Sequence, residues 1–146
     1  MEKHRCIIVI LTFNSASIIR ETVAQAQKAS PHIVVVDSHS SDGTPAILES
    51  LGCTVMQRPF SNYSDQRNWA IAQVEGSCDW QLHLDADEVL DDRGVAEISA
   101  VLAGQPAFDA YMLRRRDYFM GRMLRFSGVN PWHLRVFRSG LGRCGS

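Results

Sequence analysis

The sequence predicts an α/β fold in which a mostly parallel, twisted β-sheet is flanked by helices and followed by a β-rich C-terminal extension. Short apolar runs alternate with segments of helical spacing over residues 6–104, and this order requires the crossover connections that join parallel strands. The runs are apolar at consecutive positions, as in strands buried on both faces. After Asp109, aromatic, aliphatic and arginine residues alternate, which is typical of antiparallel strands.

The elements of the α/β part follow from apolar spacing and from helix-end residues. Strands are expected at residues 6–12, 32–37, 53–58 and 80–85. Helices are expected at residues 15–29, 45–51, 65–74 and 95–102. Asn14 and Ser15 offer a cap to the first helix, Pro45 suits the first turn of the second, and Gly52 suits its end. In the extension, strands are expected at residues 111–116 and 134–138, with turns at Gly121 and residues 128–131.

Composition places the chain among single soluble globular domains. Of its 146 residues 45% are hydrophobic and 21% are charged, and the mean hydropathy is −0.12. It has neither an apolar run of about 18 residues nor the pattern of a secretory signal, so the sequence predicts a cytoplasmic protein. The cysteines lack metal-ligand spacing and are expected to be free thiols: Cys6, Cys53, Cys78 and Cys144.

Charge is distributed unevenly along the chain. Residues 1–110 carry 7 Lys and Arg against 15 Asp and Glu, whereas residues 111–146 carry 8 Arg against Asp117 alone. A basic end of this kind favours an anionic partner, either an acceptor molecule or the inner membrane face, unless its arginines pair with the acidic part. A nucleic-acid partner is not expected, because residues 114–116 alternate faces on a strand and no aromatic platform accompanies them.

The strongest chemical motif is residues 82–88, Leu-His-Leu-Asp-Ala-Asp-Glu. An apolar strand ends there in Asp85 and Asp87, with Glu88 attached. Carboxylates at alternate positions past a strand end can face one cleft and attract a hard divalent cation that holds phosphates. The alternative is a solvated acidic turn before a helix whose first turn is favoured by the carboxylates of residues 91–92.

Two further polar segments stand near the ends of predicted elements. Asp37 ends the second strand and could accept a hydrogen bond from a base or a ribose hydroxyl, while Asp42 suits a turn or the cap of the next helix. Residues 66–68, Gln-Arg-Asn, stand at a helix start, where an anion is favoured, although a plain surface helix has the same pattern. His83 lies inside a strand and is expected to be packed rather than to bind a ligand.

Five segments in this order resemble family 2 glycosyltransferases of the GT-A fold. They are Ile8–Asn14, Val35–Thr44, Gln66–Ala70, Trp80–Glu88 and Arg135–Arg138. The nearest group is the bacterial lipopolysaccharide-core β-glucosyltransferase type, and the resemblance extends over about residues 6–138. Thr12 and Asp37 would then line the pocket for the base, and Asp85 would face the ribose and the sugar. Asp87 would hold Mg²⁺ or Mn²⁺ against the diphosphate, with Arg67 and Asn68 close to the base and diphosphate. The full nucleotide-sugar-binding set implied by the resemblance is Thr12, Asn14, Asp37, Arg67, Asn68, Asp85 and Ala86.

The resemblance also implies a reaction. A hexose would be transferred, with inversion, from a UDP-sugar to a cell-surface glycan or a lipopolysaccharide-core acceptor. This acceptor would be an anionic glycan or a lipid-linked molecule, met at the inner membrane face. Inverting transfer requires electrostatic stabilisation of the departing nucleoside diphosphate while an acceptor hydroxyl attacks from the opposite face, with no covalent enzyme intermediate. Residues 1–108 would form the nucleotide-binding part of the single domain 1–146, and residues 109–146 the start of the acceptor side.

The general base and the acceptor part of the family lie downstream of residues 135–138. No carboxylate follows Asp117, so we expect the chain to bind a donor and to transfer it poorly, with Glu88 as a weak stand-in for the base. Ser15 and His39 stand where the family usually has Glu and Gly. A donor-binding module without catalysis is one alternative. A sugar-phosphate nucleotidyltransferase is another, although residues 12–15 lack the Gly-rich basic loop it needs. The sheet edge left by a short chain would favour a homo-oligomer.

Overall fold

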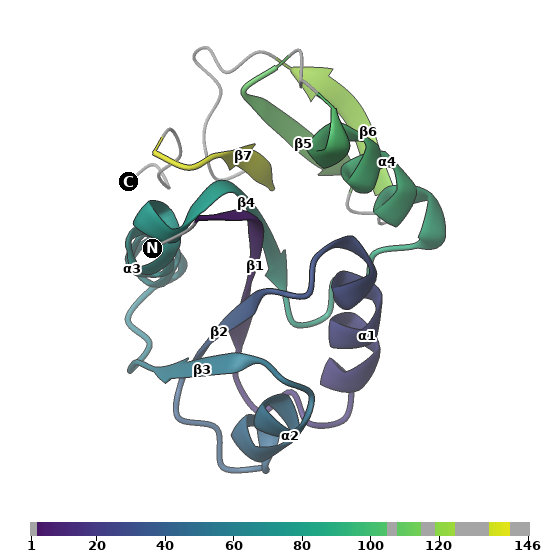
Figure 1. Cartoon of the computed structure of the whole chain (residues 1–146). Helices are drawn as coiled ribbons and strands as arrows, with labels where there is room; N and C mark the ends of the chain where they lie inside the picture. Colours follow the sequence, from purple (N-terminus) through teal and green to yellow (C-terminus); the bar gives the residue numbers. More distant parts are fainter. Residues whose placement is uncertain (1–2, 105–107, 115–118, 125–134, 141–146) are drawn as a thin grey trace.

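A single seven-stranded sheet organises the protein in this computed structural model, which describes residues 3–104, 108–114, 119–124 and 135–140 (Figure 1). The strands are β1 (His4–Thr12), β2 (Ile33–Asp37), β3 (Thr54–Gln57), β4 (Cys78–Asp85), β5 (Ala110–Arg114), β6 (Phe119–Leu124) and β7 (Val136–Arg138). Their order across the sheet is β3-β2-β1-β4-β7-β5-β6. The strands β1 to β4 pair in parallel, whereas β7 pairs antiparallel with β4 and β5, and β5 with β6. The predicted α/β class with a β-rich extension is confirmed.

Helices cover both faces of the parallel part of the sheet (Figure 1). They are α1 (Ile19–Ala29), α2 (Thr44–Ser50), α3 (Tyr63–Val74) and α4 (Asp92–Ala103), and a short 3₁₀ helix, η1 (Glu75–Ser77), follows α3. The helices α1, α2 and α4 pack on one face of the sheet and α3 packs on the other. No described helix combines the length and the apolar character that crossing a bilayer would need.

The two faces of β1 explain its continuous apolar run. Cys6, Ile8 and Ile10 join the larger core cluster with residues of α1, α2 and α4. The alternate positions, Ile7 and Val9, join the second cluster with residues of α3. Since successive side chains of a strand point to opposite faces, a strand covered on both faces has to be apolar at every position.

The strand order reverses beside β1. The chain adds β2 and β3 on one side of β1 and then returns to place β4 on the other side. In open α/β sheets, ligands bind at such a switch point, beyond the carboxyl ends of the strands. The parallel register places Thr12 beside Asp37 and Leu11 beside Asp85, so three strands end together there.

All four helices begin at residues other than those expected: α2 and α4 begin one and three residues earlier, at Thr44 and Asp92, and local contacts explain the starts of the other two. The first helix, α1, begins at Ile19 rather than at residue 15, because residues 15–18 form a turn in which the Ser15 carbonyl accepts from the N–H groups of Ile18 and Ile19. The third, α3, begins at Tyr63, with Asn62 as its cap. The side chain of Asn62 accepts from a backbone N–H of the first turn, which satisfies a donor that has no partner within the helix.

The C-terminal extension differs from expectation at one strand. Gly121 was expected in a turn, but it lies within β6, which pairs with β5. A glycine interrupts a sequence pattern without preventing strand pairing, since its backbone keeps both hydrogen-bonding groups. The turn expected at residues 128–131 lies outside the described ranges. Within those ranges Cys6, Cys53 and Cys78 are free and buried, and Cys144 lies outside them.

Candidate active site

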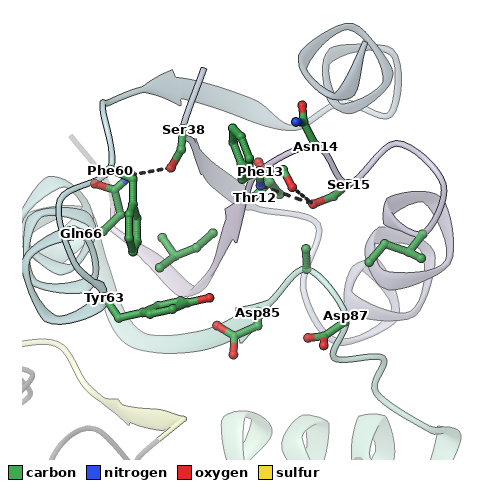
Figure 2. A pocket seen from close by; sticks show the side chains of 13 residues that line it. Thr12, Phe13, Asn14, Ser15, Ser38, Phe60, Tyr63, Gln66, Asp85 and Asp87 are labelled. Carbon is green, nitrogen blue, oxygen red and sulfur yellow. Dashed lines mark hydrogen bonds between the residues drawn. The ribbon is translucent and has the colours of Figure 1, made fainter. Parts of the chain in front are cut away.

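A pocket of about 390 Å³ opens at the carboxyl ends of β1 and β4 (Figure 2). Its walls are the end of β1 with the following loop, Ser38 after β2, the first turn of α3 with the preceding loop, and residues 85–87 after β4. Five predicted site residues line the pocket: Thr12, Asn14, Asp85, Ala86 and Asp87. The structure therefore brings together residues from the first and fourth motifs of the sequence.

Four other predicted site residues are not among those that line the pocket. Asp37, Arg67 and Glu88 are buried, with exposed fractions of 0%, 3% and 5%. Asn68 is half-buried on α3, next to Arg67. Asp37 contacts Thr12, and Arg67 and Glu88 contact Asp85, so three of the four touch residues that line the pocket.

The Asp37 carboxylate is enclosed by hydrogen-bond donors. Oδ1 accepts from the Thr12 hydroxyl at 2.7 Å and from the Ser40 hydroxyl at 2.6 Å, and Oδ2 accepts from the Ser40 N–H at 2.8 Å. A buried charge requires such partners, since desolvation otherwise makes it costly. Asp37 therefore holds the end of β1 against the loop that follows β2.

The same two loops are joined by further hydrogen bonds. The Asn14 N–H donates to Ser40 Oγ at 2.7 Å, and Asn14 Oδ1 accepts from the Ser41 N–H at 2.8 Å. The Ser15 N–H donates to Thr44 Oγ1 at 2.9 Å. Asn14 thus uses both its backbone and its side chain to fix the pocket wall.

Asp42 is a turn residue that also binds across to the first loop. Its Oδ2 accepts from the Ala16 N–H at 3.0 Å and its Oδ1 from the Thr44 N–H at 3.1 Å. The position that caps α2 is Gly43, whose φ of 88° is in the left-handed region. The hydrogen bond from the Thr44 hydroxyl, followed by that from Ala16, lowers the pKa of Asp42.

The structure shows the backbone conformation and the contacts of the two residues that depart from the family pattern, His39 and Ser15. His39 has a φ of 55°, in the left-handed region where glycine is favoured, and its N–H donates to Gln57 Oε1 at 3.0 Å. Ser15 is buried and its hydroxyl donates to the Phe13 carbonyl at 3.2 Å. A glycine is therefore the easier residue at position 39, and a small polar residue fits position 15.

Asp85 lies between two arginines. Arg67 Nη2 donates to its Oδ1 at 2.7 Å, and Arg135 Nη2 lies 3.8 Å from its Oδ2. Both guanidinium groups are largely buried, with side-chain exposures of 4% and 14%, whereas the Asp85 side chain is 25% exposed. The arginines orient the carboxylate and leave one part of it at the pocket.

Glu88 supports the same segment from behind. Its Oε1 accepts from the Asp85 N–H at 2.7 Å and lies 3.6 Å from Arg135 Nε. These contacts close the turn from Asp85 to Glu88, whose own N–H donates back to the Asp85 carbonyl at 3.0 Å. A side chain bound in this way fits a structural role in the turn better than proton transfer at the pocket.

Asp87 is the exposed carboxylate of the pocket. Figure 2 shows Asp85 and Asp87 together on the wall of the pocket that follows β4. Among the described residues, none forms a hydrogen bond or an ion pair with Asp87. Within the described residues, no group of three or more His, Cys, Asp or Glu side chains could hold a metal ion. Mg²⁺-type sites often use one or two carboxylates with phosphates and water as the other ligands, and this pocket fits that kind of site.

His83 is packed inside the sheet, as expected, but it also contacts the site. Its Nδ1 lies 3.2 Å from Arg67 Nη1, and its ring stacks on Phe137 with a centroid distance of 5.2 Å. Burial, followed by the charges of Arg67 and Arg135, holds the pKa of His83 well below its usual 6.5. The imidazole is therefore neutral.

Sequence reasoning missed the apolar rim of the pocket. In the described part of the chain, four large apolar side chains are exposed, and all of them line this pocket: Phe13, Ile18, Phe60 and Tyr63. Phe60 and Tyr63 meet edge to face with a centroid distance of 5.3 Å. The sequence signal was their position in loops or at a helix start, but only the fold shows that they share one opening.

The arginines of the basic end are described at two positions. Arg135 contacts the site, and Arg138 pairs with Asp109 at 2.9 Å. Both arginines pair with acidic residues among residues 1–110. Such pairing is the predicted alternative to binding of an anionic partner. The side chains of the other six lie outside the described part of the structure: Arg114, Arg115, Arg116, Arg122, Arg125 and Arg143.

Solved structures resemble the fold, and two of them serve as examples. Staphylococcus aureus TarS 1–349 in complex with UDP-GlcNAc matches with a TM-score of 0.66 and 19% identity, over 92% of this chain and 45% of that one. The mannosyltransferase PcManGT from Pyrobaculum calidifontis, in complex with GDP-Man and Mn²⁺, matches with a TM-score of 0.63 and 19% identity, over 94% and 45%. Together with the sheet order, these matches show the GT-A fold.

Sequence relatives point the same way. An uncharacterised glycosyltransferase from Rickettsia bellii is 37% identical over 66% of this chain and 32% of its own length. The lipopolysaccharide core biosynthesis glycosyltransferase LpsC from Rhizobium meliloti is 29% identical over 92% of this chain and 51% of its own length. The chain thus spans about a third to a half of these relatives. The family model for glycosyl transferase family 2 matches residues 7–143, and the protein therefore belongs to that family of glycosyltransferases.

Proposed function

We propose that the pocket binds a nucleoside diphosphate sugar, with UDP as the nucleotide, and that the protein takes part in inverting transfer of its hexose. The observation that supports this most directly is the pair Asp85 and Asp87 at the carboxyl end of β4, one held by two arginines and the other exposed. Solved neighbours are described as complexes with UDP-GlcNAc and with GDP-Man, which supports a nucleotide-sugar donor here.

The nucleoside would lie at the end of the pocket formed by β1 and α3. Phe13 and Phe60 offer aromatic faces on which a planar base can stack, and Thr12 and Ser38 are polar residues beside them. Asp37 would act there by holding the end of β1 against the loop after β2. That loop contains Ser40 and Ser41, which bind Asn14. Arg67 and Asn68 would contribute from α3, with Arg67 acting through Asp85.

The diphosphate would lie near Asp85, Ala86 and Asp87. A Mg²⁺ or Mn²⁺ ion held by Asp87 would offset the negative charge that develops on the departing nucleoside diphosphate. Asp85 would accept hydrogen bonds from the ribose or the sugar, because its partly exposed carboxylate faces the pocket while Arg67 and Arg135 fix its orientation. Glu88 would hold the turn that carries these residues rather than serve as the general base.

The acceptor would be an anionic glycan of the lipopolysaccharide-core kind, met at the inner membrane face. The support is the name of LpsC, a lipopolysaccharide core biosynthesis glycosyltransferase, and the six arginines after residue 110 other than Arg135 and Arg138, which pair with acidic residues of this chain. Flotation with anionic and with neutral liposomes at low salt tests the membrane part. Stronger recovery with anionic liposomes is expected, and equal recovery with both would contradict it.

Asp87→Asn tests the donor and metal assignment by calorimetry of UDP binding with and without Mn²⁺. We expect Mn²⁺ to tighten UDP binding to the unchanged protein, and the variant to lose that dependence while unfolding at the same temperature. Asp79→Asn is the matched control, because Asp79 lies near the opposite end of β4. Unchanged Mn²⁺ dependence in Asp87→Asn would refute the metal ligand, and absence of UDP binding to the unchanged protein would refute the donor site.

A further inference from the structure

One face of β4 has polar side chains at positions where apolar side chains would be expected in the core of the sheet. Gln81, His83 and Asp85 alternate along the strand on the side that faces α3, and Gln81 and His83 are 0% and 1% exposed. On the neighbouring strand β1, Ile7 and Val9 fill the same face with apolar groups. Buried polar groups reduce stability unless they are hydrogen-bonded, so this row of residues calls for a physical reason.

Hydrogen bonds connect the row into one chain that ends at the pocket. Arg67 Nη1 lies 3.2 Å from His83 Nδ1, and His83 Nε2 lies 2.7 Å from Gln81 Oε1. Gln81 Nε2 then donates to Ser139 Oγ at 3.0 Å, and Ser139 Oγ donates to the Glu75 carbonyl at 2.8 Å. The chain extends from η1 and the residue after β7, through β4, to the guanidinium that holds Asp85.

The direction of donation in this chain is determined by arginine. A guanidinium can only donate, so His83 Nδ1 has to be the bare, accepting nitrogen. The proton of the neutral imidazole is then on Nε2, where it is donated to Gln81 Oε1. The Gln81 amide is in turn oriented with its nitrogen toward Ser139. His83 and Gln81 therefore each have one orientation that satisfies their neighbours, with the Arg67 guanidinium as the donor at one end of the chain.

We propose that His83 is a positioning residue for donor binding: its Nδ1 accepts from Arg67 and so sets the guanidinium to hold the Asp85 carboxylate at the pocket. Arg67 contacts His83 and Asp85 through separate nitrogens, and a planar guanidinium cannot turn without changing both contacts. Gln81 and Ser139 set the tautomer and the ring orientation of His83. The proposal rests on the proposed donor site, since its effect is measured there.

Three substitutions at His83 separate this role from simple packing. In His83→Asn the side-chain oxygen can take the place of Nδ1 and accept from Arg67. In His83→Gln the longer amide reaches the place of Nε2 instead and leaves the Nδ1 position without an acceptor. His83→Phe keeps an aromatic ring against Phe137 but offers no acceptor. Packing alone predicts that phenylalanine is the mildest change, whereas the positioning role predicts that asparagine is.

The experiment is calorimetry of UDP binding in the presence of Mn²⁺, with thermal unfolding measured on the same samples. We expect the dissociation constant to rise about tenfold or more in His83→Phe and His83→Gln, the scale of a lost hydrogen bond to a charged group. In His83→Asn it should stay within about threefold of the unchanged protein. His32→Phe, at an exposed histidine next to His4 and away from the pocket, is the matched control and should have no effect.

A second arm tests whether His83 acts through Arg67. In an Arg67→Lys background, His83→Phe should weaken UDP binding by less than about threefold, because the group that His83 positions is already replaced. Equal binding by all three His83 variants, a loss in His83→Asn as large as in His83→Phe, or full additivity with Arg67→Lys would each overturn the positioning role while UDP binding itself persists. Failure of the unchanged protein to bind UDP would instead refute the donor site, and the positioning role with it.

Discussion

Arg67 donates to Asp85 at 2.7 Å from α3 to the end of β4, and this ion pair links the buried side of the sheet to the pocket. The Arg67 side chain is 4% exposed and that of Asp85 is 25% exposed. A buried ion pair adds little to the free energy of unfolding, because the cost of desolvating the two charges offsets much of their attraction. Removing one partner nevertheless destabilises the protein, because it leaves a buried charge unpaired. The pair is therefore better suited to holding a geometry than to raising stability.

Arg67→Lys should weaken both folding and UDP binding. An ammonium group lacks the planar fork that reaches His83 and Asp85 together, so one contact is lost. We expect the free energy of unfolding to fall by about 1–3 kcal/mol and UDP affinity to fall about tenfold. Urea unfolding and calorimetry measure the two effects. Arg20→Lys, at an exposed position of α1, should change the stability by less than about 0.5 kcal/mol. Equal effects of the two substitutions would contradict the importance of the buried pair.

Thr12→Val should destabilise the protein without changing its shape. Valine has the same branching but no hydroxyl, so the fully buried Asp37 carboxylate loses one donor. The expected loss in the free energy of unfolding is about 1–3 kcal/mol. Thr54→Val, at an exposed position of the edge strand β3, provides the comparison and should be close to neutral. Denaturant unfolding of both variants decides the matter, and a neutral Thr12→Val would show that Asp37 does not need this bond.

His39→Gly should leave stability unchanged or raise it by up to about 1 kcal/mol. Glycine adopts the left-handed conformation of position 39 without the steric cost that an L side chain has, although its unfolded chain is more flexible. His39→Val should instead destabilise by at least about 1 kcal/mol, since a β-branched residue fits this region poorly. Thermal unfolding ranks the three proteins, and valine ranking above glycine would refute the backbone assignment.

The stability of the protein should fall as the pH decreases below about 6.5. The pKa of His83 is held well below 6.5 in the folded state, by burial first and then by Arg67 and Arg135. Between the folded and unfolded pKa values only the unfolded chain binds the proton, so acid favours unfolding. The slope contributed is at most about 1.4 kcal/mol per pH unit. Urea unfolding at several pH values measures it, and His83→Asn should remove this part. An equal slope in the variant would assign the effect to other groups.

The buried cysteines should resist alkylation in the folded protein. Burial raises the pKa of Cys6 to about 12 and that of Cys53 to about 11, and it also raises the pKa of Cys78. At about pH 8 the thiolate fraction of Cys6 is then about 1 in 10⁴, and the thiolate is the form that reacts. Mass spectrometry after iodoacetamide treatment should find these three cysteines labelled only in urea. Rapid labelling without urea would contradict their burial.

The candidate site was predicted from sequence where its residues follow strand ends. Asp85 and Asp87 come directly after an apolar run, and Thr12 ends another, so parallel pairing alone brings them to one edge. The positions of Arg135 and of the aromatic rim could not be predicted in this way. Arg135 reaches Asp85 because β7 pairs antiparallel with β4, a long-range pairing that no local pattern specifies.

The helix α3 shows the same limit from the opposite direction. Its buried face includes Gln66 and Arg67 as well as Ala70 and Val74, so its sequence has no clear apolar stripe. Gln66 is buried because Ser38 and Arg58 satisfy its amide, and Arg67 is buried with its two terminal nitrogens in contact with His83 and Asp85. Polar residues can occupy a core only when distant parts of the chain supply their partners.

The amino-acid sequence by itself determined the order of strands and helices, the burial of β1 on both faces, and the place of the two aspartates after β4. Apolar spacing and helix-end residues encode these features locally. The tertiary structure decided which side chains face the pocket and which are enclosed behind it. Asp37 became a buried support, Asp87 remained exposed, and His83 became the partner of Arg67, because these outcomes depend on hydrogen bonds between segments that only the folded sheet brings together.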